Sequence, residues 1–300
     1  MKKIARNLSK SPLFANARHL LDLNRRDENY PLTKWQKCLV GSYMVLQDYS
    51  EGVFPPKHKE EQATFDAENA CFDTPGRTSP QERRLGSMQK PFWHGPACAK
   101  YLRDYIDIQT SMHKLGVRPP ASLLEVGCGS GWMAEFLTNS GFKVLATTLD
   151  GEDVKQVRLR RQSLKTKGMH AALDFRQSPM EYVYENVRDM PPFDGVYVYE
   201  ALHHAHDWKK AIKSFYDALA PNGWCFICSE PNVMHTLVSY RVGRLTNTHE
   251  IGIVPAHLRK HLKDVGFTKV LLLKNRIHWW IKPIWIAAQK GITGSGVSIG

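Results

Sequence analysis

The pattern of hydrophobic and polar residues divides the chain into a helical first part and a later part in which strands alternate with helices. In the later part, short apolar runs bounded by turn residues predict seven strands, at 122–127, 143–148, 171–176, 194–200, 224–230, 268–274 and 281–288. Residues at helical spacing predict helices between them, and the clearest helix covers 207–219, where Ile212 and Phe215 share one face. Such alternation predicts a mostly parallel sheet.

Helical spacing of apolar residues also dominates the first part of the chain. It predicts helices over 14–23, 32–49 and 97–115. The prolines at positions 55, 56, 75 and 80 predict a loop-rich segment over 51–92, which forms either a lid or a linker. Another helix is predicted near the end of the chain, at 255–265, where Gly266 closes it.

Breaks in these patterns predict the domain organisation. The pair Pro119-Pro120 separates the helices of the first part from the alternating region. The final ten residues are rich in Gly and Ser and are expected to be disordered. We therefore expect an N-terminal helical appendage at 1–118, a core domain at 119–290 and a tail at 291–300.

Composition and charge narrow the class of protein. Of the 300 residues, 42% are hydrophobic and 23% are charged, which is typical of a globular protein with a sizeable core. The formal net charge of +12 indicates anionic partners, such as a phosphorylated substrate, nucleic acid or lipid headgroups. No apolar run is long enough to span a bilayer, and no signal-peptide pattern follows Met1.

Six cysteines are spaced too irregularly for a disulfide framework, so reduced thiols and a cytoplasmic protein are expected. Cys225 and Cys228 have C-x-x-C spacing. They fall in a predicted buried strand, where positions three apart point to opposite faces. We interpret them as core thiols and predict no metal site.

A glycine-rich turn follows the first predicted strand. The segment Glu125-Val-Gly127-Cys128-Gly129-Ser-Gly131 runs directly into a helical pattern, which gives strand, tight turn and helix. Ligands bind at such turns in open α/β sheets. The third glycine comes one residue too early for the dinucleotide motif, and no lysine follows as in a P-loop.

Two further motifs accompany this turn at suitable spacing. The first is the segment 193–204, Phe-Asp-Gly-Val-Tyr-Val-Tyr-Glu-Ala-Leu-His-His, and the second is 219–223, Leu-Ala-Pro-Asn-Gly. Together with the glycine turn they resemble class I S-adenosylmethionine-dependent methyltransferases. The resemblance covers about residues 120–290, and about the first 100 residues resemble no family. It implies a Rossmann-like α/β fold with a seven-stranded, mostly parallel sheet whose last strand is antiparallel.

The resemblance also implies that S-adenosylmethionine is the cofactor and that the glycine turn holds it. The residues expected to bind it there are Glu125, Gly127, Cys128, Gly129 and Gly131. A carboxylate at the end of the second strand usually binds the ribose. This chain has Thr148 in that position and Asp150 two residues later. Either residue is a candidate ribose ligand, and Asp150 is also a candidate cap for the next helix.

The loop after the third strand and the end of the fourth complete the implied cofactor site. Ser178 stands where the family commonly has an aspartate near the adenine amine. Met180 suits either an adenine face or the core. Glu200 follows the fourth strand and is predicted to face the same crevice as the glycine turn.

Several histidines are candidates for chemistry on the acceptor. His203 and His204 follow the fourth strand, and either is a candidate base for a hydroxyl acceptor, with a structural role as the alternative. His94, His249 and Glu250 are candidate substrate contacts.

Two basic segments remain. In the helix after the second strand, the cations are expected to form a solvated outer face. Segment 274–285 mixes cations with tryptophans and suits either a peripheral membrane contact or, as we favour, a strand pair.

The favoured function is O-methylation of a small molecule or of a carbohydrate- or lipid-linked intermediate. One alternative is an RNA methyltransferase, which the charge suggests and the lack of an N/D-P-P-Y/F tetrapeptide disfavours. The other is a non-catalytic partner subunit, which the departures at Thr148, Ser178 and Asn222 suggest.

Overall fold

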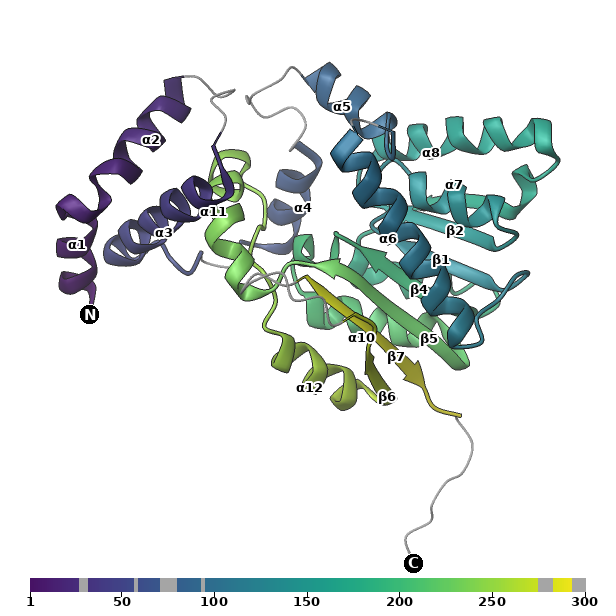
Figure 1. Cartoon of the computed structure of the whole chain (residues 1–300). Helices are drawn as coiled ribbons and strands as arrows, with labels where there is room; N and C mark the ends of the chain where they lie inside the picture. Colours follow the sequence, from purple (N-terminus) through teal and green to yellow (C-terminus); the bar gives the residue numbers. More distant parts are fainter. Residues whose placement is uncertain (27–31, 57–58, 71–79, 93–94, 275–282, 293–300) are drawn as a thin grey trace, which may run out of the picture. The chain divides into compact units, whose positions relative to one another are not determined.

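Figure 1 shows the computed structural model of the chain, which describes residues 1–26, 32–56, 59–70, 80–92, 95–274 and 283–292. Contacts group the described residues into two compact units. Unit 1 contains residues up to Leu85 together with Pro231–Ile253, and unit 2 contains Gly86–Glu230 together with the described residues from Val254 onward. The predicted domain boundaries stay predictions.

Unit 2 is built on one seven-stranded sheet. Its strands are β1 (Ser122–Val126), β2 (Lys143–Thr148), β3 (Leu173–Gln177), β4 (Phe193–Tyr199), β5 (Leu219–Glu230), β6 (Phe267–Leu272) and β7 (Ile284–Lys290). Their order is β3-β2-β1-β4-β5-β7-β6. Strand β7 is antiparallel to both of its neighbours, and the other pairs are parallel. The predicted fold class is confirmed.

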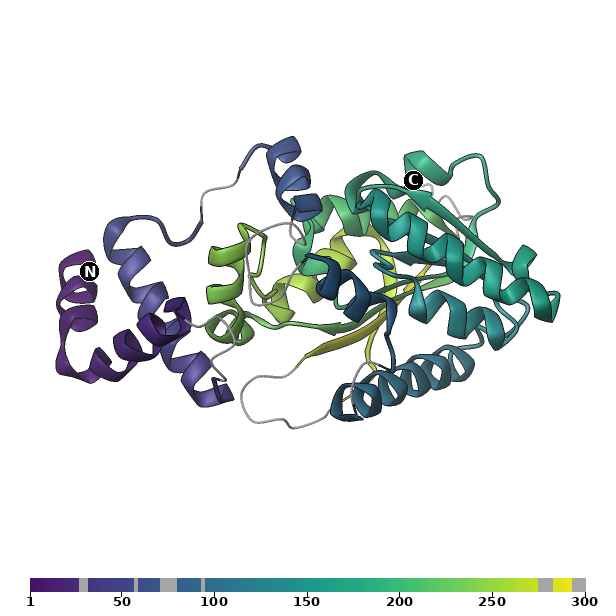
Figure 2. The same ribbon diagram turned by 90° about the horizontal axis from the view of Figure 1, so that it is seen from above.

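Helices cover both faces of this sheet (Figures 1 and 2). They are α6 (Gly95–Lys114), α7 (Trp132–Asn139), α8 (Gly151–Ser163), α9 (Val183–Val187), α10 (Trp208–Ala218) and α12 (Pro255–Val265). Ile108 of α6 and Leu137 of α7 are buried in one core cluster with Phe226 of β5. Strands β1, β2 and β4 are buried at nearly every position, as expected for parallel strands covered on both faces, and β1 leads directly into the glycine turn.

The two cysteines of the C-x-x-C pattern are both buried in β5 and form no disulfide. Cys228 joins the core cluster that contains α6 and α7, whereas Cys225 does not. Burial raises the pKa of both thiols, which leaves them protonated. The prediction of core thiols is confirmed.

Unit 1 is helical. Its helices are α1 (Lys2–Lys10), α2 (Ala15–Arg26), α3 (Lys34–Glu51), α4 (Glu61–Asn69) and α11 (Thr236–Thr246). A Cβ on Gly41 of α3 would lie 1.8 Å from the carbonyl oxygen of Leu237, so glycine lets α3 and α11 cross closely. Asp48 accepts a hydrogen bond from the Tyr240 hydroxyl at 2.7 Å and lies 3.1 Å from Nε of Arg244.

The prediction that 51–92 is rich in loops was wrong for two of its parts. Helix α4 lies between the proline-rich breaks, and α5 (Pro80–Met88) begins at a proline. Proline is tolerated in the first turn of a helix, where its missing N–H has no partner to lose. Among the described helices, none is both long and apolar enough to cross a membrane.

Candidate cofactor and active site

The three glycines of the turn after β1 all have left-handed backbone conformations, with φ of 70° at Gly127, 50° at Gly129 and 72° at Gly131. A Cβ on Gly127 would lie 2.6 Å from the Cε atom of Met180, and one on Gly131 would lie 2.7 Å from a methyl of Val157. At Gly129 the nearest atom is 3.8 Å away. Gly127 and Gly131 therefore permit close packing, whereas a Cβ on Gly129 would make only an ordinary van der Waals contact, with a carboxylate oxygen of Asp153.

Backbone hydrogen bonds join the ends of the first three strands. The N–H of Cys128 donates to the carbonyl of Thr147 at 2.9 Å, and the N–H of Ser178 donates to the carbonyl of Thr148 at 2.8 Å. The Thr147 hydroxyl donates to the carbonyl of Glu125 at 2.9 Å. The structure thus brings the glycine turn, Thr148 and Ser178 to one edge of the sheet, where parallel α/β folds bind ligands.

Glu125 lies in the interior beneath this turn, with an exposed fraction of 3%. Burial raises the pKa of its carboxyl to about 8, although hydrogen bonds from Tyr197 and from the backbone of Ala134 lower it in part. Burial likewise raises the pKa of the Cys128 thiol. Both side chains are therefore neutral near pH 7 and support the turn from below.

Glu125→Gln is expected to flatten the dependence of stability on pH. The folded chain keeps this carboxyl protonated up to about pH 8, whereas the unfolded chain ionises it near its ordinary pKa of about 4.3. The favourable contribution is therefore complete below the unfolded pKa and is lost as pH rises towards 8, by at most about 5 kcal/mol. Urea unfolding at several pH values measures it. Exposed Glu185→Gln is the control, and a wild-type slope in Glu125→Gln would contradict the assignment.

Asp150 caps α8, because its carboxylate accepts a hydrogen bond from the N–H of Glu152 at 2.8 Å. Thr148 is buried at the end of β2. Nothing in this geometry separates the two as ribose ligands, and the assignment stays a prediction.

The loop after β3 closes over the glycine turn. The Ser178 hydroxyl is buried, donates to the carbonyl of Pro179 at 2.9 Å and accepts from Asn186 at 2.8 Å. Met180 lies against Gly127 of the turn. Its thioether therefore packs directly against the glycine turn, as expected for a residue beside the cofactor or in the core.

Glu200 has a left-handed backbone, with φ of 50°, at the point where β4 ends. Its carboxylate lies 2.5 Å from the Lys100 ammonium of α6, which also contacts the Tyr199 hydroxyl at 2.9 Å and Asp104 at 3.2 Å. Burial opposes the charge of Lys100, but the Glu200 and Asp104 carboxylates outweigh it and raise the pKa of Lys100. Sequence reasoning missed Lys100 because α6 precedes every recognised motif.

A second cation, Lys90, lies on the segment 87–90, which contacts the glycine turn. The Ser130 hydroxyl of the glycine turn donates to the carbonyl of Ser87 at 2.8 Å. Burial lowers the pKa of Lys90, although the charges of Glu200 and Asp153 raise it in part. The Lys90 ammonium is therefore influenced by a carboxylate at the end of β4, Glu200, and by one on α8, Asp153.

Arg160 of α8 holds this segment to the turn. Its guanidinium donates to the carbonyls of Ser130 at 2.7 Å, Met88 at 2.8 Å and Lys90 at 2.9 Å, and to the carboxylate of Glu135 at 2.8 Å. The side chain is only 11% exposed. The expected solvated outer face is therefore wrong for Arg160. The exposed Lys155 and Arg158 of this helix agree with it, as do Lys165 and Lys167 in the short 3-10 helix that follows.

His203 is buried in a pair with Glu230 at the end of β5. Its Nδ1 lies 2.9 Å from Oε2 of Glu230. The other carboxylate oxygen, Oε1, accepts hydrogen bonds from the backbone N–H groups of Ala201 at 2.8 Å and Leu202 at 3.0 Å. Burial opposes ionisation, but the His203 and backbone hydrogen bonds prevail and hold the pKa of Glu230 below its ordinary value. An anionic Glu230 favours the tautomer with a proton on Nδ1, which leaves Nε2 as the basic nitrogen.

Of the remaining predicted residues, His204 lies beside His203, His249 and Glu250 belong to unit 1, and His94 is not described. The ring of His204 stacks on His203 with centroids 4.1 Å apart. In unit 1, the N–H of His249 donates to Glu68 at 2.8 Å, and the carbonyl of Glu250 accepts from Ser239 at 2.9 Å. His94 lies outside the described residues.

The basic and aromatic segment 274–285 is described only at its two ends. Trp285 is buried in β7, and the ammonium of Lys274 lies 3.3 Å from the centre of its ring. Trp285 therefore belongs to the packed sheet, as expected for a strand, whereas Lys274 lies beyond the end of β6 at Leu272. Residues 275–282 lie outside the described part of the chain.

Comparisons with known proteins show the family to which the chain belongs. Residues 100–272 match the family model described as "Methyltransferase domain", so the chain belongs to this methyltransferase family. The fold is that of the class I S-adenosylmethionine-dependent methyltransferases. The magnesium protoporphyrin IX methyltransferase of Synechocystis PCC 6803, solved with bound SAH, aligns with a TM-score of 0.55 and 14% identity over 77% of this chain and all of that one. The CurJ carbon methyltransferase aligns with a TM-score of 0.52 and 17% identity over 92% of this chain and 71% of that one.

Curated relatives are similar at lower coverage. A ubiquinone biosynthesis O-methyltransferase of Idiomarina loihiensis is 29% identical over 50% of this chain and 57% of its own length. One of Rhodopseudomonas palustris is 24% identical over 74% of this chain and 86% of its own length. The chain thus spans about three fifths of the length of the first relative.

Proposed function

We propose that the chain is an S-adenosylmethionine-dependent O-methyltransferase of a small molecule. One observation carries the cofactor assignment: a turn with three left-handed glycines, uncrowded at Gly129, lies at the edge where three parallel strands end. This cradle fits the amino-acid and sugar parts of the donor. The residues that would hold it are Glu125, Gly127, Cys128, Gly129, Gly131, Thr148, Asp150, Ser178, Met180 and Glu200. When bound, S-adenosylmethionine supplies a methyl group already activated on a sulfonium.

Two cations extend the proposed donor site. The Lys90 ammonium is held near the turn by the segment that Arg160 anchors, and it can pair with the carboxylate of the donor. Lys100 keeps the Glu200 carboxylate fixed at 2.5 Å. Rigidly placed charged groups can hold the donor in one orientation. Alignment of the donor with the acceptor can lower the activation barrier by about 7–11 kcal/mol.

His203 is proposed as the base that takes the proton of an acceptor hydroxyl. Glu230 would act as its positioning residue, because it holds the ring through Nδ1 and leaves Nε2 to accept a proton. His204 packs on the same ring and remains the other candidate base. Substrate contacts at His94, His249 and Glu250 stay proposals.

The acceptor is proposed from the names of the relatives. These are O-methyltransferases of ubiquinone biosynthesis, so we infer an oxygen of a quinone precursor, which is a small molecule that can carry a lipid chain. A glycan-linked acceptor is the alternative small molecule. We also propose that the protein is cytoplasmic and that segment 274–285 makes a peripheral membrane contact. The net charge of +12 supports an RNA acceptor as a second candidate.

A transfer assay tests this function. The full chain is incubated with methyl-labelled S-adenosylmethionine and a panel of phenols, catechols and polyprenylated phenols, with bulk RNA in a separate arm. Label in an ether product of a phenol is expected. Label in RNA alone, with a steep salt dependence, would replace the proposal. Donor binding without any product would favour a non-catalytic subunit.

A further inference from the structure

Helix α1 of unit 1 presents an apolar stripe to solvent. Met1, Ile4 and Leu8 are 90%, 64% and 45% exposed, and their spacing of three and four residues places them on one side of the helix. Leu13, just beyond the helix, is 77% exposed. The buried positions of α1, Ala5 and Ser9, instead face the rest of unit 1. Packing within unit 1 therefore does not account for the stripe.

The same helix is strongly basic. It carries Lys2, Lys3, Arg6 and Lys10, and its sequence contains no acidic residue. A helix with an exposed apolar stripe and cations on its polar side is typical of helices that lie in the plane of a membrane surface.

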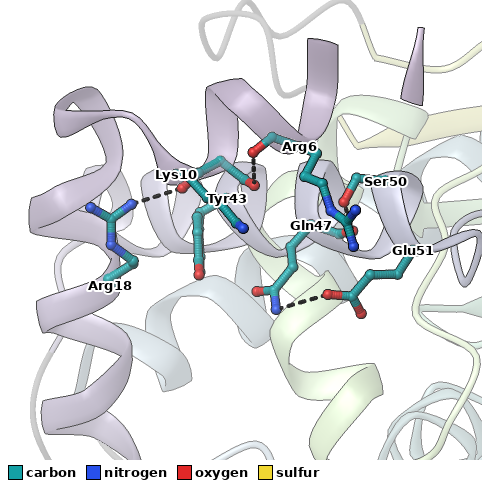
Figure 3. A pocket seen from close by; sticks show the side chains of 8 residues that line it. Arg6, Lys10, Arg18, Tyr43, Gln47, Ser50 and Glu51 are labelled. Atoms are coloured by element: carbon teal, nitrogen blue, oxygen red, sulfur yellow. Dashed lines mark hydrogen bonds between the residues drawn. The ribbon is translucent and has the colours of Figure 1, made fainter. Parts of the chain in front are cut away.

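A cationic cavity adjoins α1 (Figure 3). It measures about 460 Å³ and receives the side chains of Arg6, Lys10 and Arg18. Its carboxylate, Glu51, accepts a hydrogen bond from Gln47 at 3.2 Å. Arg18 also donates to the carbonyls of Ser9 at 2.7 Å and Ser11 at 3.3 Å, which fixes the end of α1 beside the cavity. Three cations against one carboxylate favour an anionic group such as a phosphate.

We propose that α1 docks the chain on anionic phospholipid membranes. The stripe of Met1, Ile4 and Leu8 enters the boundary between headgroups and acyl chains, and the cations of α1 and the adjoining cavity contact lipid phosphates. Charge complementarity selects this occupant, because an apolar stripe alone would bind any hydrophobic surface, whereas the basic side requires a negative one. This inference is independent of the transfer reaction.

Vesicle co-sedimentation of the full chain tests the proposal. Vesicles of phosphatidylcholine are compared with vesicles that also contain phosphatidylglycerol. We expect binding only to the second kind, weakened by salt. Ile4→Ser with Leu8→Ser should reduce it about tenfold or more, and Lys3→Glu with Lys10→Glu should abolish it. Leu159→Ser, at a position 52% exposed on α8, is the matched control and should bind as wild type does.

Three results would overturn the proposal. They are absence of binding to phosphatidylglycerol vesicles, equal binding to both kinds of vesicle, and wild-type binding by the Ile4/Leu8 variant. Circular dichroism melting checks that the variants fold, and because both replaced leucine and isoleucine side chains are exposed, their melting should match the wild type. Inorganic phosphate is added as a competitor. Full displacement by phosphate at constant ionic strength would show that the anion site alone holds the vesicle, without insertion of the apolar stripe, and would also contradict the proposal.

Discussion

Replacement of His203 by alanine is expected to lower the rate of methyl transfer about 10²–10⁴-fold, the usual contribution of a general base. The donor should still bind, because the residues proposed to hold it lie on the glycine turn and at the ends of other strands and do not include this ring. Single-turnover rates with a phenolic acceptor measure the change, and donor affinity is measured in parallel. Added imidazole should restore part of the rate, since it can replace the missing base.

Two matched variants separate a catalytic role from a structural one. Glu230→Gln keeps the shape of the partner but removes the charge that holds the Nδ1 proton, so its rate should fall between those of wild type and His203→Ala. His204→Ala removes the stacked ring and should cost little rate. If His203→Ala turned over at the wild-type rate, His203 would not be the base. A loss confined to His204→Ala would transfer the role to that residue.

Arg160→Met is expected to lower the free energy of unfolding by about 3–5 kcal/mol. The wild-type guanidinium makes four hydrogen bonds, and the Arg160 side chain is only 11% exposed. Methionine would therefore leave three backbone carbonyls and the Glu135 carboxylate without this hydrogen-bond donor. The segment 87–90 would then be released from the glycine turn. Donor affinity should therefore fall together with stability, as chemical denaturation and calorimetric titration can both show.

The neighbouring residue on the same helix supplies the control. Arg161 lies 3.5 Å from Asp174, with 37% of its side chain exposed. Exposed ion pairs contribute about 0–1 kcal/mol, so Arg161→Met should change stability by no more than that. Equal losses in the two variants would show that α8 responds to any lost arginine, which would contradict the special role of Arg160.

The core of the fold was predictable because its signals are local. Strands β1, β2, β4 and β7 are short apolar runs that are buried at most positions. Residues 221–223 predicted a turn before the fifth strand, but Asn222, with φ of 63°, lies within β5, which begins at Leu219. The glycine turn was predictable because left-handed conformations favour glycine at Gly127, Gly129 and Gly131. Helix α11 was not predicted, and its packing against α3 is a long-range contact that the sequence does not show.

The parts of the site that the sequence did not reveal are long-range pairs. Lys100 and Glu200 are 100 positions apart, and Arg160 reaches back to the carbonyls of Met88 and Lys90. For Glu230, the sequence predicted only that it is the last residue of a strand. A backbone carbonyl carries no sequence signal, and a lone lysine or arginine on a helix is most often solvated. Only the packed structure identifies these partners.

Calorimetric titration of the full chain with S-adenosylmethionine tests directly whether the glycine turn binds the donor. We expect saturable binding at one site, and loss of at least tenfold in affinity for Gly129→Val, which places a branched side chain on the turn. Gly168→Val is the control, because Gly168, in a different loop, also has a left-handed φ, of 68°, and a Cβ there would have no atom within 4 Å. It should bind the donor as wild type does. Absence of heat at millimolar donor, or unchanged affinity in Gly129→Val, would contradict the account.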